Sequence, residues 1–267
     1  MKNNQKIDFI TVTYGNMFSV VKRTVESLYK FTSPPFNVYI INNGSTDETR
    51  TYFDKFPNCR VVNLEDNAGM VEGFNTGVKL SDSPYIVRMD HDIELIMPWK
   101  ERFLSWFEKD DKIAMVGPRV ITADGRIYSA CFNFHFRYLR AIKTRDILKI
   151  PKMLRHFFYW SENHFAQDDD EKYGVVKEVP HITGTFEVIK KEVFEKVGLF
   201  DNSYTGKNGV YEDLDYTLRM AASGYKIIYD GTVKIIHYCS RPLQKTPPQP
   251  AAPQRSNRKR LRKKWGI

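Results

Sequence analysis

The segment Tyr85-Ile86-Val87-Arg88-Met89-Asp90-His91-Asp92 joins a short, largely apolar run to two aspartates spaced two residues apart. The run is predicted to be a strand, and in an open parallel sheet ligands bind beyond the carboxyl ends of the strands. Two carboxylates at such a place can lean toward one cation, and hard oxygen ligands suit Mg²⁺ or Mn²⁺. The alternative is that Asp90 and Asp92 only cap a turn before Pro98, but their place after three strand–helix units favours a metal.

On both sides of this segment, strand and helix patterns alternate. Short β-branched runs predict strands, and apolar residues at helical spacing predict helices. The predicted strands are Ile7–Thr13, Val38–Ile41, Arg60–Leu64 and Ile113–Val116, and the predicted helices are Phe18–Tyr29, Val71–Leu80 and Pro98–Glu108. Ser45 is expected to cap a further helix from Thr46, with Glu48 completing a capping box. The alternation predicts an α/β fold with a mostly parallel, Rossmann-like central sheet flanked by helices.

The second half of the sequence is less regular. A turn at 123–126 predicts a hairpin, and residues 137–174 show no clear periodicity. Beyond them the sequence predicts a strand with a glycine break, two helices and two short strands. These are Val179–Ile189, then Lys191–Val197 and Glu212–Ser223, then Lys226–Tyr229 and Val233–His237.

The positive charge is confined to the last tenth of the chain. The protein has 41 Lys and Arg against 32 Asp and Glu, a net charge of +9. Nine of the basic residues and no acid lie in 241–267, so the remainder is neutral. This segment is first Pro-rich and then basic, a composition that cannot bury a core. We therefore predict one domain over residues 1–240 and a disordered tail over 241–267.

Several classes of protein are disfavoured by the sequence. No apolar run approaches the length of a membrane helix, and the first residues do not resemble a secretory signal. Three scattered cysteines fit neither a disulfide framework nor a zinc site. The chain also lacks the glycine patterns of dinucleotide-binding enzymes and P-loop ATPases. A cytoplasmic location is the simplest expectation.

Two further polar clusters lie near predicted strand and helix ends. Ile41–Asp47 and Thr11–Tyr14 fall on the same sheet edge and could hold a nucleotide base and ribose, although ordinary turn chemistry also explains them. Glu212 and Asp213 begin a helix, where acids complement the helix dipole. Either could instead point into a cleft as a general base. A lone histidine such as His237 is usually a core residue.

Taken in order, these motifs resemble family 2 glycosyltransferases of the GT-A fold. The resemblance covers about residues 5–240, with 137–174 poorly matched, and is strongest toward rhamnosyltransferase-like bacterial polysaccharide enzymes. The matching motifs, besides Asp90-His91-Asp92, are Thr11–Tyr14, Ile41–Asp47, Asn67-Ala68-Gly69, Asn75-Thr76-Gly77, Val116–Arg119, Thr183-Gly184-Thr185, Val197–Asp201 and Glu212–Asp215.

The resemblance implies an enzyme that moves a sugar from a nucleoside diphosphate donor to an acceptor hydroxyl with inversion. Asp213 would be the catalytic base, and Asp92, His237 and Asp90 would hold Mn²⁺ or Mg²⁺. The nucleotide pocket would include Thr13, Tyr14, Asn43 and Asn67, besides Asp90 and Asp92. Many relatives have aspartates where this chain has Asn42 and Asn43, so in this chain an amide would contact the base.

Acceptor contacts are expected from the irregular segment 137–174, whose aromatic residues could stack on sugars or pack inward as a helix hairpin. The candidates are Trp160, Thr183, Gly184 and Glu212. The acidic run 168–171 is expected to be a solvated loop. The acceptor would be a glycan or a lipid-linked glycan, and residues 255–265, with Leu261 and Trp265 at the interface, could attach the enzyme to anionic membranes.

Two other functions fit parts of the sequence. A sugar nucleotidyltransferase is also an α/β protein with metal-binding carboxylates, but it usually has a Gly-rich basic loop after the first strand, which this chain lacks. A nucleic-acid-binding protein could act through the basic tail, but the neutral remainder of the chain disfavours nucleic acid as a partner.

Overall fold

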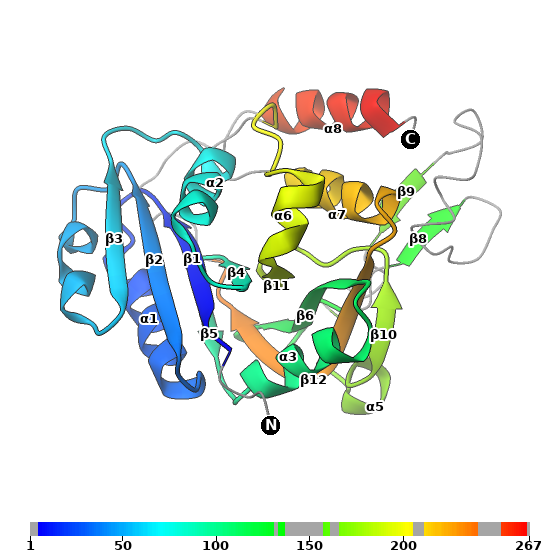
Figure 1. Ribbon diagram of the computed structural model, residues 1–267, viewed down its shortest axis with the longest axis horizontal. Coiled ribbons are helices and arrows are strands. Elements are labelled where there is room, and N and C mark those ends of the chain that lie inside the picture. The colour runs from blue at the N-terminus through cyan, green and yellow to red at the C-terminus, as the bar shows by residue number, and fades with distance from the viewer. Residues whose placement is uncertain are drawn as a thin grey trace.

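A ten-stranded sheet forms the centre of the computed structural model (Figure 1). The structure describes residues 5–130, 166–204, 211–239 and 255–265 in full, and the backbone alone of 133–136, 157–160 and 252–254. The strands are β1 Ile7–Thr13, β2 Phe36–Asn43, β3 Cys59–Leu64, β4 Tyr85–Met89, β5 Ile93–Leu95, β6 Ile113–Thr122, β7 Ile127–Ser129, β8 Asn133–Phe136, β9 Phe157–Trp160, β10 Val176–Val179, β11 Phe186–Lys190 and β12 Lys226–His237. The helices are α1 Phe18–Phe31, α2 Met70–Leu80, α3 Lys100–Lys109, α5 Asp170–Tyr173, α6 Lys191–Val197, α7 Glu212–Ala222 and α8 Ala252–Trp265, with 3₁₀ turns at Glu48–Arg50 and Tyr52–Lys55.

Strand β4 lies in the middle of this sheet. The strand order is β10-β12-β6-β11-β4-β1-β2-β3, with β5 beside β12 and β7 beside β6. The half formed by β3, β2, β1 and β4 is parallel, as predicted. Beyond β4, β11 runs antiparallel to both of its neighbours, β4 and β6. The α/β class is confirmed, and the second half of the sheet contains more antiparallel pairing than the sequence pattern suggested.

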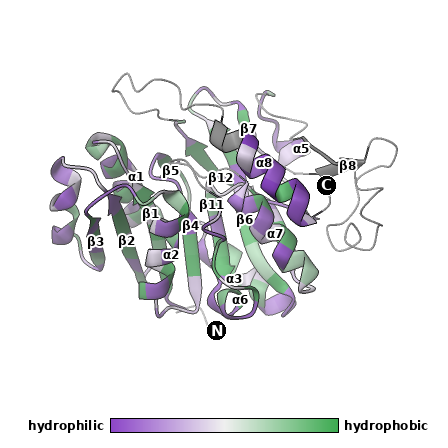
Figure 2. Ribbon diagram, turned by 90° about the horizontal axis from the view of Figure 1, so that it is seen from above, coloured by the Kyte–Doolittle hydropathy of each residue, from purple (hydrophilic) through white to green (hydrophobic). Residues whose placement is uncertain are grey.

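Helices cover both faces of the sheet and divide the core into two layers. Alternate residues of a strand point to opposite faces, and β1 shows this directly. Ile7 and Phe9 belong to the cluster beneath α1 and α3, while Ile10 and Val12 belong to the cluster beneath α2, α6 and α7. Figure 2 shows the hydrophobic strands between more hydrophilic helices. Residues of β4 divide in the same way, so Arg88 shares the face of Ile86, toward α7.

Helix α2 packs against β1 at very short range because two of its residues are glycines. A Cβ on Gly77 would lie 2.4 Å from Ile10 Cγ2, and one on Gly73 would lie 2.8 Å from Val12 Cγ1. No heavier residue fits there without moving the helix. Gly77, the last residue of the Asn75-Thr76-Gly77 motif, therefore serves helix–sheet packing.

Three local predictions can now be judged. The hairpin at 123–126 is confirmed by the antiparallel pair β6 and β7. The helix capped by Ser45 is wrong: the chain forms 3₁₀ turns, and Asp47 caps the first by accepting from the Thr49 N–H at 3.1 Å. The two short strands before His237 are one strand, β12, with an irregular register between Asp230 and Lys234.

The tail contains an ordered helix where disorder was predicted. Leu261 of α8 is buried in a small apolar cluster with Tyr204, Leu214 and Leu218. Lys264 Nζ and Trp265 Nε1 donate to the buried Asp215 carboxylate at 3.0 and 2.8 Å. Composition suggested disorder because the basic residues cannot form a core of their own. The partners that bury α8 are supplied by α7 and the preceding loop (Figure 1).

Among the residues the structure describes, no helix is both long enough and apolar enough to cross a membrane.

Candidate active site

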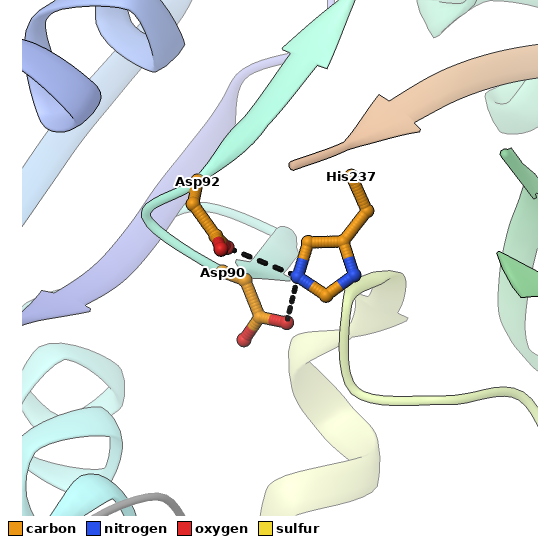
Figure 3. Close-up of side chains that lie close together, drawn as sticks. All are labelled: Asp90, Asp92 and His237. Atoms are coloured by element: carbon orange, nitrogen blue, oxygen red, sulfur yellow. Dashed lines mark hydrogen bonds and ion pairs between the residues drawn. The ribbon is translucent and has the colours of Figure 1, made fainter. Parts of the chain in front are cut away.

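Asp90, Asp92 and His237 converge at the carboxyl end of β4 (Figure 3). The chain leaves β4 at Asp90, and β12 ends at His237, which brings the imidazole to the two carboxylates. His237 Nε2 lies 3.1 Å from Asp92 Oδ1 and 3.7 Å from Asp90 Oδ2. One ligand atom from each residue falls within 4.8 Å of the others. Two carboxylate oxygens and one imidazole nitrogen at this spacing form a donor set that fits a divalent cation.

The electrostatics of this cluster favour a positive charge. Burial alone would lower the pKa of His237, but the hydrogen bond with Asp92 and the charges of both aspartates raise it to about 10. Burial and the neighbouring Asp92 raise the pKa of Asp90. Without a metal, the proton on His237 is therefore the cation that the carboxylates hold. A divalent cation would take the place of that proton.

The cluster is held in place by the surrounding backbone and rings. The Tyr238 N–H donates to the Asp92 carbonyl at 2.9 Å, and the Asp90 N–H donates to the Thr185 carbonyl at 3.0 Å. The Tyr128 ring packs edge-on against the His237 imidazole, with centroids 4.3 Å apart. The first two contacts fix the backbone at Asp90 and Asp92, and the third holds the imidazole ring of His237.

The predicted nucleotide pocket lies at the ends of β1 and β2. Thr13 at the end of β1 is buried beside Asn42 of β2, and the Tyr14 ring packs edge-on against the His91 ring. The hydroxyl groups of Thr11, Thr13 and Ser45 are buried and have no hydrogen-bond partner among the described residues. Buried hydroxyl groups are normally paired. These three groups are exceptions, and each is covered by the surrounding protein.

Asn43 and Asn67 contact each other. The Asn43 amide donates to Asn67 Oδ1 at 2.9 Å, and its carbonyl oxygen accepts from the Ala68 N–H at 2.8 Å. Asn67 Oδ1 also accepts from the Gly69 N–H at 2.9 Å. The pair thus joins the loops that follow β2 and β3.

Asp213 lies at the first turn of α7 and remains partly exposed, at 21% of its side-chain surface. Its Oδ2 accepts from the Gly184 N–H at 3.3 Å, and its Oδ1 accepts from the Leu214 N–H at 2.7 Å. His181 Nε2 lies 3.7 Å from the same Oδ2, and burial lowers the pKa of His181 to about 4, so this histidine is neutral. An exposed carboxylate held by two backbone N–H groups suits a proton acceptor.

A buried ionic cluster that the sequence did not predict lies next to Asp213. It consists of Arg88, Glu187 and Glu212. Arg88 Nη1 lies 3.3 Å from Glu187 Oε2, and Nη2 lies 2.6 Å from Glu212 Oε1. Burial, against the pull of Arg88, raises the pKa of Glu187 to about 8 and that of Glu212 to about 7. A charged residue within each of two apolar strands was the signal that could have identified it.

The four predicted acceptor residues, Trp160, Thr183, Gly184 and Glu212, have different surroundings in the structure. Thr183 Oγ1 approaches Ser129 Oγ at 3.3 Å, and Gly184 supplies the N–H that binds Asp213. Glu212 is only 4% exposed and is paired with Arg88. It is therefore a buried counter-ion of Arg88 and not a residue exposed to an acceptor. Trp160 is in β9, and its side chain lies outside the described residues.

The acidic run at 168–171 is solvated in part, as predicted, since Asp169, Asp170 and Glu171 are exposed. Two of its carboxylates nevertheless have partners in the protein. Asp168 and Asp170 form ion pairs with the buried Arg119 at 2.9 and 2.6 Å. Lys234 of β12 lies 2.6 Å from Asp168. Asp215 is buried among Tyr204, Arg219 and the residues of α8.

Comparison with known proteins gives a consistent result. The sequence profile described as "Glycosyl transferase family 2" matches residues 8–198. The teichoic acid poly(glycerol phosphate) polymerase of Staphylococcus epidermidis is 31% identical over 107 residues, which cover 38% of this chain and 15% of that protein. The poly-beta-1,6-N-acetyl-D-glucosamine synthase of the same organism is 23% identical over 227 residues, 84% of this chain and 48% of the synthase. The chain thus spans less than half the length of either relative.

A solved structure shares the fold of this chain. The crystal structure of GalNAc-T7 with UDP, GalNAc and Mn²⁺ superposes with a TM-score of 0.72 at 16% identity. The superposition covers 98% of this chain and 49% of that one. At this identity the likeness establishes the fold, and it confirms the expected GT-A architecture.

Proposed function

Because this chain belongs to glycosyl transferase family 2, we propose that it transfers a sugar from a nucleoside diphosphate donor to a hydroxyl of a glycan or lipid-linked acceptor. The observation that carries the proposal is the convergence of Asp90, Asp92 and His237 at the end of β4. Relatives named as synthases or polymerases of cell-surface polymers favour a polysaccharide acceptor. The transfer would invert the anomeric carbon in a single displacement.

The metal would be Mn²⁺ or Mg²⁺, held by Asp92 and His237, with Asp90 at or next to the metal. Two carboxylate oxygens and a nitrogen that is basic enough to attract a cation support this assignment. When bound, the divalent cation would offset the negative charge of the departing diphosphate. His237 would bind it in the neutral form, so binding would release a proton.

Asp213 would take the proton of the acceptor hydroxyl. Its exposed carboxylate is oriented by the Gly184 and Leu214 N–H groups, which leaves its remaining lone pairs available to a substrate. A carboxylate at this place can remove one proton as the new glycosidic bond forms, which is the base that a single displacement requires.

Thr13, Tyr14, Asn43 and Asn67 would surround the nucleoside. The Tyr14 ring packs against His91, which lies between Asp90 and Asp92 in the sequence, and this supports a nucleoside beside the proposed metal site. Asn43 is already paired with Asn67 and Ala68, so its contact with a base would use the amide hydrogen not given to Asn67.

The proposal is tested by the product of the reaction. The protein is incubated with Mn²⁺ and a panel of nucleotide sugars, chosen by which nucleoside diphosphate raises its melting temperature most. Release of a nucleoside diphosphate supports sugar transfer. In a second incubation with a nucleoside triphosphate and a sugar 1-phosphate, release of pyrophosphate would assign the protein to the nucleotidyltransferases. Neither product from any of these donors, with glycan acceptors present, would remove the proposal.

We also propose that α8 draws the enzyme to anionic membrane surfaces. Leu261 and Trp265 were expected at the membrane interface, but both pack against the protein and are not available for insertion into a bilayer. The exposed side chains of Arg255, Arg258, Lys259, Arg262 and Lys263 remain for electrostatic attraction. A variant with R258E, K259E and R262E keeps the buried contacts. It should lose sedimentation with phosphatidylglycerol vesicles that the wild type retains at low salt, and equal binding of both proteins would contradict the idea.

A further inference from the structure

Arg88 is the one basic residue of β4, and it is buried at the face of the sheet that α7 covers. It stands opposite Glu187 in the antiparallel pair of β4 and β11, and its guanidinium also pairs with Glu212. The Phe200 ring lies 4.8 Å from its Cζ on one side. Such a guanidinium is fixed in both position and direction by charge-assisted contacts.

Two backbone segments next to Asp213 both contact the Arg88 guanidinium. On one side, Glu212 is the residue before Asp213 and the first residue of α7, and it is joined to Arg88 at 2.6 Å. On the other side, Gly184 donates its N–H to Asp213, and a Cβ added to Gly184 would lie 2.5 Å from the Arg88 Cζ. The backbone that binds Asp213 therefore lies directly against Arg88.

The backbone conformation just before Glu212 is strained and must be held by neighbouring contacts. Tyr211 caps α7 with a φ of 71°, in the left-handed region that side chains other than glycine seldom adopt. A strained residue of this kind persists only where its surroundings determine it. The ion pair of the next residue, Glu212, with a buried arginine provides that constraint.

We infer that Arg88 is a positioning residue for the base Asp213, acting through Glu212 and Gly184. The inference rests on the proposed function and assigns Arg88 no contact with the donor, the acceptor or the metal. It predicts that disturbing Arg88 reduces turnover and leaves the binding of nucleotide and metal intact.

The test compares R88K with a matched control, R119K. Arg119 is likewise a buried arginine paired with two carboxylates, 3% exposed, but its partners are Asp168 and Asp170. Lysine keeps the charge in both variants and removes the planar fork that reaches two carboxylates at once. Melting temperature, affinity for UDP and GDP with Mn²⁺, and steady-state kinetics are measured for both variants and the wild type.

For R88K we expect kcat to fall by about 10²-fold, the effect of displacing a reacting group by about 1 Å. The donor KM and the affinity for UDP or GDP should stay within about twofold of the wild-type values, since the inference assigns Arg88 no contact with the donor or the metal. R119K should keep its kcat. A folded R88K variant with unchanged kcat would overturn the inference, and so would a loss expressed only in KM.

A second measurement separates this inference from the proposed function. Hydrogen exchange of the Gly184 and Leu214 amides, which donate to Asp213, should be faster in R88K than in the wild type and unchanged in R119K. This result holds even if the wild type transfers no sugar at all. Unchanged exchange in a folded R88K variant would show that Arg88 does not position Asp213.

Discussion

Two groups of charged side chains lie along the same strand and solve the same electrostatic problem in opposite ways. At the carboxyl end of β4, Asp90 and Asp92 face a histidine, and this group lacks a permanent cation. Inside the sheet, Glu187 and Glu212 face Arg88, which is always charged. The first group can exchange its cation and the second cannot.

The contrast between these two groups indicates which carboxylates are available for chemistry. Buried carboxylates require a positive partner. Where the chain supplies an arginine, the cluster is closed and serves structure. Where it supplies only an ionisable imidazole, a metal can replace the proton. Asp213 lies beside the closed group but keeps its own oxygens partly exposed, so it combines a rigid setting with a free carboxylate.

The largest effect is expected from D213N. An amide cannot accept the acceptor proton, so turnover should fall by up to about 10⁴-fold, while binding of UDP or GDP with Mn²⁺ is retained. A radiolabelled-sugar transfer assay and a thermal-shift titration measure the two quantities. Turnover equal to that of the wild type would remove Asp213 as the base.

The next effect concerns folding and contrasts the two groups directly. R88M leaves two buried carboxylates without their cation and should lower the free energy of unfolding by about 3–5 kcal/mol. D90N relieves a carboxylate whose pKa is raised by burial and by Asp92, so the metal-free protein should gain up to about 1 kcal/mol. Urea unfolding measures both. A loss of stability in D90N as large as that in R88M would contradict the comparison.

A smaller effect is expected on the metal itself. D92N removes one ligand and the hydrogen-bond partner of His237, so turnover at low Mn²⁺ should fall by about 10²-fold, with partial recovery at high Mn²⁺. Treatment with EDTA should abolish the activity of the wild type, and Mn²⁺ should restore it. Full activity in metal-free buffer would exclude a metal role for Asp92 and His237.

The smallest effect is a change in the pH dependence of stability. The pKa of Glu187 is near 8 in the folded protein and near 4.5 when exposed, so the folded state binds the proton more tightly. This contribution is present below about pH 4.5 and is lost as the pH rises to about 8. E187Q stays neutral beside Arg88, Glu212 and Asp213, so its stability relative to the wild type should rise by about 1 kcal/mol between pH 7 and 8. Parallel unfolding curves at the two pH values would refute this prediction.

The sequence predicted those parts of the site that depend on strand ends. Asp90 and Asp92 could be placed because an apolar run stops just before them, and parallel strands bring their ends to one edge. Only the family resemblance assigns His237 to the metal, because His237 and Asp92 are 145 positions apart in the sequence, which hides their contact. Periodicity cannot report which distant strands become neighbours.

What the sequence could not predict depends on partners far along the chain. Arg88 lies in an apolar strand, and its burial makes sense only once β11 and α7 supply carboxylates. Likewise, α8 has a basic, proline-containing sequence that suggested disorder, and it is ordered because Asp215 and a small apolar cluster receive it. In both cases tertiary contacts override the local composition.

The central place of β4 has a consequence for how this protein can change over evolutionary time. Five residues of one strand set the face on which Arg88 lies and the point at which Asp90 leaves the sheet. Because side chains alternate between faces, inserting or deleting one residue within β4 would send the arginine into the opposite apolar layer and shift both aspartates away from His237. Substitutions elsewhere can accumulate one at a time, whereas the length of this strand is fixed by two sites at once.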